Sequence, residues 1–242
     1  MNKGGLIITR PHRKDFVYEK LVFGAEKPIE IKPLNRSISG LPVIYQGQVN
    51  SCVSCSVTFL KQWYEENRPE LSWEWLAIIS KTGENGASFK QVLDPARKTG
   101  ICEEREWIQF DPTINKLEDL YLDASKHKIG EYFFINKIDP QTLYNALVND
   151  PIIVGVWNWG GVWGGHAMVA YDVTEDGQNL LCANWWDNKV QSIATVPFDV
   201  VVKAIVIAKL DKTKDDVRHD LFTHILNNLK YICSKTSRSL IG

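Results

Sequence analysis

Long apolar stretches are absent from this sequence: no run reaches the roughly 18 residues that a membrane-spanning helix needs. An excess of one charge is absent too, because 28 Lys and Arg residues balance 29 Asp and Glu residues and leave a net charge of −1. No cluster of Lys and Arg alternates with aromatic residues. We therefore expect neither a nucleic acid nor a membrane as a partner.

We expect no secretory signal in the N-terminal residues. The apolar residues between Gly5 and Arg10 are too few for the core of such a signal, and charged residues follow at once. The cysteines are odd in number and lack the spacing of a disulfide framework; they are Cys52, Cys55, Cys102, Cys182 and Cys233. We expect free thiols and a cytoplasmic location.

The composition that is present is typical of a globular protein. The 242 residues, 44% of them hydrophobic and 24% charged, are enough to bury a substantial core. Apolar residues follow a helical spacing up to about residue 150, and short runs rich in β-branched and aromatic residues come after it. This change predicts an α+β fold, with a helical lobe at about 50–149 and an antiparallel β lobe at about 150–210.

Individual elements follow from the same patterns. We expect helices at residues 51–67, 71–83, 88–100, 116–128 and 139–150. Ser51 and Ser72 occupy the N-cap positions of the first two, and Pro95 is expected near the first turn of the third or at a kink. We expect strands at 151–159, 166–174, 179–188, 190–199 and 204–210, with a hairpin turn at 174–179.

Two segments flank the domain expected at residues 39–210. Residues 1–38 are broken by several prolines and predict an extended lead-in, with a short strand at residues 5–9. Residues 211–242 contain a charged segment and one amphipathic helix. That helix would pack on the same chain, self-associate or dock on a partner.

The stretch "YQGQVNSCVSC" places Cys52 and Cys55 three residues apart at the start of an expected helix. The positive end of the helix dipole favours a thiolate at Cys52. A redox pair is disfavoured because no βαβ unit precedes it, and zinc because no second Cys-x-x-Cys or His pair supplies four ligands. One nucleophile with a bystander, or two buried core thiols, are the interpretations left.

A catalytic thiol needs a base, usually histidine, and the chain has five histidines. His12, His127, His219 and His224 lie where solvated surface histidines are expected: in the lead-in, at a Lys-rich helix end and near the C-terminus. His166 differs, because it follows two glycines and opens an apolar strand. A histidine at that position could lie at the rim of a cleft, or it could simply cap the strand.

Asn184 ends the next β run, one hairpin after His166. A strand–turn–strand return would bring the two side chains together, so that the Asn184 carbonyl oxygen could orient the imidazole. Trp185 and Trp186, which follow, would either shield that hydrogen bond from water or belong to the core.

Three blocks, "LPVIYQGQVNSCVSC", "GGHAMVAYDV" and "NWWDN", resemble in this order the signature blocks of the papain-like cysteine peptidases. The similarity covers about residues 38–210, and residues 71–107 resemble the helical section of the compact bacterial and viral members. The resemblance implies a two-lobed papain-like fold: an N-terminal helical lobe, a C-terminal antiparallel β-barrel-like lobe, and the active cleft between them.

Position by position, the resemblance implies that Gln46 is the oxyanion glutamine, Cys52 the nucleophile, His166 the base and Asn184 its orienter. Cys52 stands six residues after Gln46, as the family's nucleophile does. This spacing assigns Cys55, nearly one turn further along, to the core.

The resemblance also matches Gly86 to the backbone strip that pairs with an extended substrate, and Trp186 to the shielding tryptophan. Departures are Val49 in place of a disulfide cysteine, Val53 in place of a tryptophan, and "NWWDN" in place of an Asn-Ser-Trp-Gly block. They change the cleft wall and leave the four polar roles intact.

The implied activity is hydrolysis of peptide bonds in a polypeptide substrate through a thioester acyl-enzyme, with no metal and no organic cofactor. The alternatives are another acyl transfer on the same fold, as in an isopeptidase, transamidase or amidase, and a non-catalytic binding protein. The lead-in is too short for a long helical pro-segment, although the first residues could still fold across the cleft.

Overall fold

A computed structural model describes residues 5–9, 30–109, 117–161 and 164–208 of the chain. Its contacts divide the chain into two units, Met1–Ala208 and Lys209–Gly242. All described residues belong to the first unit, so the helix expected within 211–242 lies outside them. None of the described helices is long and apolar enough to cross a membrane.

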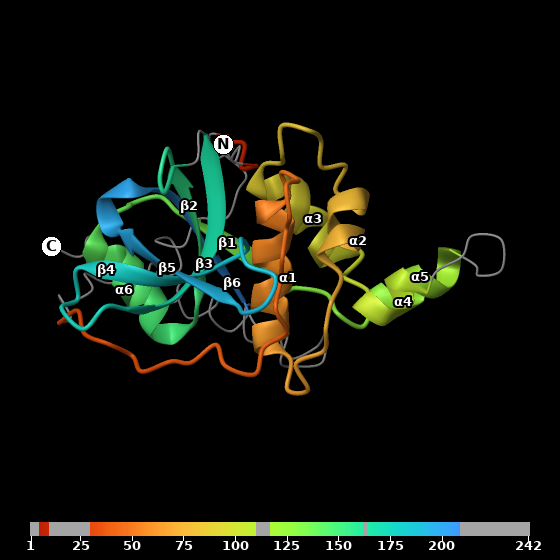
Figure 1. Ribbon diagram of the computed structural model, residues 1–242, viewed down its shortest axis with the longest axis horizontal. Helices are drawn as coiled ribbons and strands as arrows, with labels where there is room; N and C mark the ends of the chain where they lie inside the picture. Colours follow the sequence, from red (N-terminus) through yellow and green to blue (C-terminus); the bar gives the residue numbers. More distant parts are fainter. Residues whose placement is uncertain (1–4, 10–29, 110–116, 162–163, 209–242) are drawn as a thin grey trace, which may run out of the picture. The chain divides into compact units, whose positions relative to one another are not determined.

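One six-stranded sheet, in the order β1-β6-β2-β3-β4-β5, forms the centre of the first unit (Figure 1). Every neighbouring pair of strands is antiparallel. The strands are β1 Tyr132–Ile135, β2 Ile152–Trp157, β3 Gly165–Val173, β4 Asn179–Asn184, β5 Ser192–Pro197 and β6 Val201–Ile207. With the helices below, this sheet confirms the α+β class.

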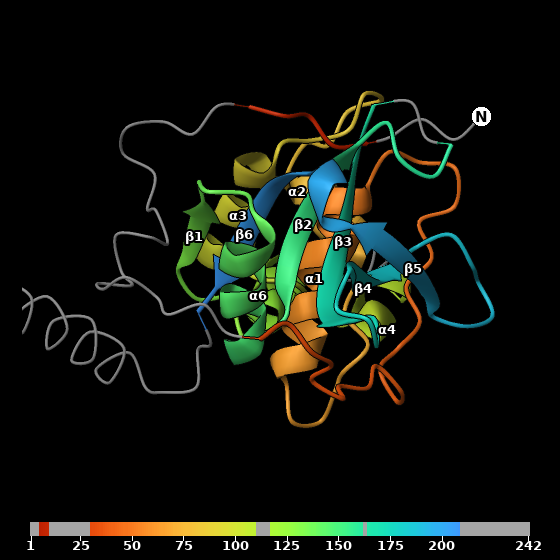
Figure 2. The same ribbon diagram turned by 90° about the vertical axis from the view of Figure 1, so that its left-hand side faces the viewer.

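The helices are α1 Cys52–Tyr64, α2 Trp73–Ile79, α3 Phe89–Lys98, α4 Glu104–Ile108, α5 Leu117–Ala124 and α6 Pro140–Asn149, with a short 3-10 helix at Phe198–Val200. Helix α1 packs along one face of the sheet, mainly against β3, and α2 and α3 pack on the far side of α1 (Figure 1). Helix α6 covers the opposite face of the sheet (Figure 2).

The two faces of the sheet follow from the two-residue period of the strands. In β2, Ile153 belongs to the core on the α1 side, whereas its neighbours Ile152 and Val154 belong to the core on the α6 side. In β3, Val169 and Met168 divide in the same way. Because both faces are buried, these strands appear in the sequence as continuous apolar runs and not as an alternating pattern.

Several expected elements have different limits in the structure. Residues 5–9 do not form a strand; only Leu6 makes β-bridges, one with Ala87 and one with Gly165. Pro95 lies inside α3 and not in its first turn. Ser72 caps α2 as expected, but the Ser51 side chain makes no capping hydrogen bond to α1.

The sheet also begins earlier than the change in composition suggests. β1 belongs to the sheet although it lies before residue 150, and α6 packs with the core of the sheet. Neither β1 nor α4 was expected from the sequence. Both are short, and a run of four or five residues carries too little periodicity to be recognised.

The lead-in is attached to the sheet by the buried Asp172 of β3. One carboxylate oxygen of Asp172 accepts from the Leu34 N–H at 2.7 Å and the other from the Arg36 N–H at 2.8 Å. The first oxygen also accepts from the Val173 N–H. The Arg36 guanidinium then donates to the carbonyl oxygens of Leu147 and Val148 at the end of α6.

The substitution Asp172→Ala tests this attachment. It leaves the buried Val173 N–H and the partly buried Leu34 and Arg36 N–H groups without acceptors. We therefore expect the free energy of unfolding to fall by about 3 kcal/mol in urea denaturation. Asp176→Ala is the matched control, because that exposed carboxylate only bridges its own turn, and a loss of about 1 kcal/mol is expected there. Equal losses in the two variants would contradict the assigned role of Asp172.

Candidate active site

The Cys52 thiol is the first side chain of α1 and lies where α1 packs against β3. It is fully buried and accepts hydrogen bonds from the backbone of Ala167, in β3, and of Gly5. Burial raises the pKa of the thiol to about 11, and these hydrogen bonds offset only part of that rise. The thiol is therefore neutral at pH 7, because desolvation outweighs the helix-dipole effect expected from the sequence.

His166 and Asn184 meet at one end of the sheet. β3 and β4 are paired neighbours, and the His166 Nε2 atom lies 2.8 Å from the Asn184 Oδ1 atom. The same oxygen accepts from the Trp185 N–H at 2.9 Å. An amide oxygen can only accept, so Nε2 carries the imidazole proton and Nδ1 is left as the basic nitrogen. Burial lowers the pKa of His166 to about 4, against a smaller opposing effect of the Asn184 hydrogen bond.

Two tryptophans cover this pair. The Trp186 ring stacks on the His166 imidazole with centroids 4.8 Å apart, and Trp159 stacks on Trp186 with centroids 6.3 Å apart. Trp185 is fully buried, and its indole N–H donates to the Ala167 carbonyl oxygen. Of the two tryptophans considered from the sequence, Trp186 stacks on the imidazole and Trp185 belongs to the core. Trp159 had no sequence signal.

Asn184 is itself held by the β4–β5 connection. The Gln191 side chain donates to the Asn184 carbonyl oxygen, and the Ser192 hydroxyl donates to it at 3.0 Å. The other end of the Gln191 amide accepts from the Ile44 N–H at 3.1 Å. Sequence reasoning missed Gln191 because nothing in the sequence relates it to residues 44 and 184.

Gln46 lies beside the same strand end. Its backbone N–H donates to the Trp185 carbonyl oxygen at 3.1 Å, and its side-chain Nε2 donates to the Val49 carbonyl oxygen at 3.0 Å. The Gln46 Oε1 atom is buried and has no hydrogen-bond partner. One Nε2 hydrogen therefore remains for a further acceptor.

A continuous set of contacts thus links the polar residues expected at the site. Cys52 contacts the residue that follows His166, His166 contacts Asn184, and Gln46 contacts the residue that follows Asn184. Cys55 is fully buried among core residues, and burial raises the pKa of its thiol well above the ordinary value. All cysteines in the described part of the chain are free thiols.

Three N-terminal residues, Gly5–Ile7, cross this site and are called the strap below. The Leu6 N–H donates to the Gly165 carbonyl oxygen at 2.8 Å. The Ile7 N–H donates to the Ala87 carbonyl oxygen, and the Ala87 N–H donates to the Gly5 carbonyl oxygen, both at 2.9 Å. The strap therefore lies between the segment that follows Gly86 and the start of β3. The expected role of Gly86 in binding an extended backbone stays a prediction.

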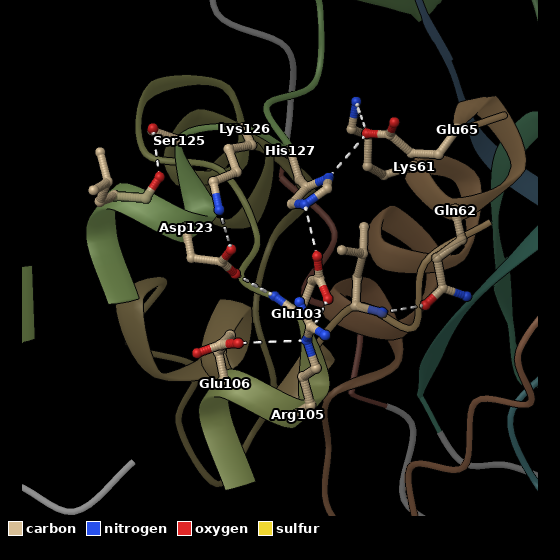
Figure 3. A network of polar contacts seen from close by, with 12 residues as sticks. Lys61, Gln62, Glu65, Glu103, Arg105, Glu106, Asp123, Ser125, Lys126 and His127 are labelled. Atoms are coloured by element: carbon tan, nitrogen blue, oxygen red, sulfur yellow. Dashed lines mark hydrogen bonds and ion pairs between the residues drawn. The ribbon is translucent and has the colours of Figure 1, made fainter. Parts of the chain in front are cut away.

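A second polar cluster surrounds His127, on the helical side (Figure 3). Side-chain atoms of Glu103, Asp123 and His127 that could bind a metal ion lie within 4.8 Å of one another. Lys126 already pairs with Asp123 at 2.8 Å, and Arg105 already pairs with Glu103 at 2.9 Å. Because cations already pair with these carboxylates, the cluster is suited to joining its own loops and not to holding a metal ion.

The same cluster corrects one expectation from the sequence. The His127 side chain is only 12% exposed, and its Nδ1 lies 3.1 Å from Glu65 at the end of α1. It is therefore not the solvated histidine that the sequence suggested. Burial alone would raise the pKa of Glu65, but hydrogen bonds from Lys61 and His127 outweigh it and lower that pKa.

The similarity of this chain to known proteins is structural. No family model and no curated protein matches the chain. The chain is similar to xylellain, a cysteine protease from Xylella fastidiosa, with a TM-score of 0.67, 19% identity, and 86% of this chain and 97% of that chain covered. It is similar to a procathepsin L2 proteinase from Tenebrio molitor larval midgut, with a TM-score of 0.61, 15% identity, and 85% and 78% covered.

A third similar structure is the Carica candamarcensis cysteine protease CMS1MS2, with a TM-score of 0.53, 16% identity, and 69% of this chain and 92% of that chain covered. These likenesses show that the chain has the papain-like cysteine peptidase fold. The fold implied by the three sequence blocks is confirmed.

The burial of His166 predicts how stability depends on pH. The unfolded chain binds a proton at His166 below its ordinary pKa of 6.5, whereas the folded chain does so only near pH 4. Protonation of the unfolded chain therefore lowers the free energy of unfolding as pH falls from 6.5 to 4, by about 3 kcal/mol in total. Urea denaturation should show this loss, and the loss should be smaller in His166→Gln. An identical pH dependence in the two proteins would contradict the buried neutral imidazole.

Proposed function

We propose that the protein is a cysteine peptidase that hydrolyses peptide bonds through a thioester on Cys52. The observation that carries the proposal is the buried 2.8 Å contact between His166 and Asn184, together with a thiol at a helix start that accepts from Ala167, the residue after His166. That contact leaves Nδ1 of His166 as the only basic nitrogen of the ring. A catalytic thiol requires such an oriented base, and the papain-like fold supplies the same order of groups along the chain.

The chemistry proceeds in two halves. In the first, Nδ1 of His166 takes the proton of the Cys52 thiol, and the sulfur attacks the carbonyl carbon of a peptide bond. The resulting oxyanion accepts hydrogen bonds from the Cys52 N–H and the Gln46 side-chain amide. The tetrahedral intermediate then collapses to a thioester, and the imidazolium gives its proton to the departing amine.

In the second half, water attacks the thioester while His166 accepts one of its protons. The carboxylic acid leaves, and the thiol regains its proton. Asn184 keeps the Nε2 proton in place throughout, and Trp186 excludes water from that hydrogen bond.

Charge separation depends on hydration of the site. In the described state burial holds both partners neutral, because it raises the pKa of Cys52 and lowers that of His166. Both shifts have the same cause, so hydration of the site moves both pKa values back toward their ordinary values and lowers the free-energy cost of proton transfer from Cys52 to His166.

A covalent probe tests the proposal. One of the similar proteins, the Carica candamarcensis protease, is described in complex with E-64. We expect prolonged incubation of this chain with E-64 to add one inhibitor molecule at Cys52, as mapped by peptide mass spectrometry. Cys52→Ala should abolish the addition, and His166→Ala should slow it by about 100-fold or more because the base is lost.

Cys55→Ala is the matched control, because it removes a buried thiol three residues away and leaves the proposed nucleophile. Full labelling is expected in this variant. Labelling that follows Cys55 in place of Cys52, or no labelling after prolonged incubation, would exclude the proposed nucleophile. If amines are added and the products are amides of those amines in place of free acids, the reaction is acyl transfer to an amine and not hydrolysis.

A further inference from the structure

Residues 42–49 bring Gln46 to the site without forming a helix or a strand. We infer that Gln191 is a positioning residue, whose side chain fixes this segment against the sheet and so holds the Gln46 amide where the oxyanion forms. Gln191 bonds only to backbone groups in the described part of the chain, so it acts through Gln46. The inference rests on the proposed function, which gives Gln46 its role at the oxyanion.

Few hydrogen bonds hold this segment in place. In the described part of the chain, only two join residues 42–49 to the rest of the protein. One runs from the Gln46 N–H to the Trp185 carbonyl oxygen at 3.1 Å, and the other from the Ile44 N–H to the Gln191 Oε1 atom, also at 3.1 Å. Apart from the packing of the buried Ile44 side chain, these two bonds therefore set where the segment lies.

The two hydrogen bonds close a ring that includes Asn184. The Gln191 Nε2 atom donates to the Asn184 carbonyl oxygen, while Oε1 of the same amide accepts from Ile44. Trp185 follows Asn184 and accepts from Gln46, which lies two residues after Ile44. The ring thus fixes the backbone on the oxyanion side of the site relative to the backbone on the side that orients the imidazole.

The two ends of the bridge require an amide at residue 191. A carbonyl oxygen only accepts and a backbone N–H only donates, so the group between them must donate at one end and accept at the other. A carboxylate would place two acceptors against each other at Asn184. A hydrocarbon side chain would leave the Ile44 N–H and one bond of the Asn184 carbonyl oxygen unmade.

Loss of the bridge affects Gln46 more than Asn184. Asn184 belongs to β4, pairs with Ser192 of β5, and its carbonyl oxygen also accepts from the Ser192 hydroxyl at 3.0 Å. Residues 42–49 pair with no described strand, so without Gln191 a single hydrogen bond would join them to the sheet. A shift of about 1 Å in a group that stabilises the transition state can cost about 100-fold in rate.

The first test compares Gln191→Leu with Ser192→Ala in the full chain. Both remove one donor from the same Asn184 carbonyl oxygen, but only Gln191→Leu also releases Ile44. In Gln191→Leu we expect kcat for a fluorogenic peptide, per Cys52 that E-64 labels, to fall by about tenfold or more, with KM changed by less than about threefold. Ser192→Ala should lower kcat by less than about threefold. Equal losses in the two variants would overturn the inference.

The second test asks whether Gln191 acts through Gln46. Gln46→Ala removes the proposed oxyanion donor, so the position of residue 46 then matters little. In that background Gln191→Leu should lower kcat by less than about threefold, against about tenfold or more in the wild-type background. The same loss in both backgrounds would mean that another residue carries the effect, and would overturn the inference.

Amide hydrogen exchange tests the bridge without relying on activity. In Gln191→Leu the Gln46 N–H should exchange about tenfold faster or more, although its own acceptor, the Trp185 carbonyl oxygen, is unchanged. Ser192→Ala should change that rate by less than about twofold. Unchanged exchange at Gln46 in Gln191→Leu would overturn the inference whether or not the chain is a peptidase. Failure of E-64 to label Cys52 in the wild-type chain would instead exclude the proposed function itself.

Discussion

The packing of α1 against β3 is the contact on which the rest of the site depends. It places the first residue of the helix beside Ala167 of the strand, more than a hundred residues later in the chain. Antiparallel pairing of β3 with β4 then places Asn184 against His166. A helix start and two strand ends hold Cys52, His166 and Asn184, so these three side chains lie on the regular elements of the fold and not on loops.

The same close packing has an electrostatic consequence. Removing water from the thiol and the imidazole disfavours the charged form of each, so both groups are neutral in the covered state. The backbone of Gly5 is one of the groups that surround the buried thiol.

Where local signals in the sequence were strong, they identified helix ends and turns correctly. Ser72 caps α2, and the turn at residues 174–179 joins β3 to β4. Weak or non-local signals failed. Ser51 occupies a cap position without capping, and His127 is drawn into a polar network by Glu65, which lies 62 residues earlier. Neither outcome could be inferred from neighbouring residues.

By itself, the sequence determined the order of the longer helices and strands, though not β1 or α4. It also determined the three blocks that hold Gln46, Cys52, His166 and Asn184, because spacing and residue type act over a few positions. Only the tertiary structure decided that Gly5–Ile7 crosses the site and that Gln191 bridges Asn184 and Ile44. Those facts depend on backbones that approach across long separations in the chain. A glutamine has the same letter whether its amide faces solvent or joins two distant segments of backbone.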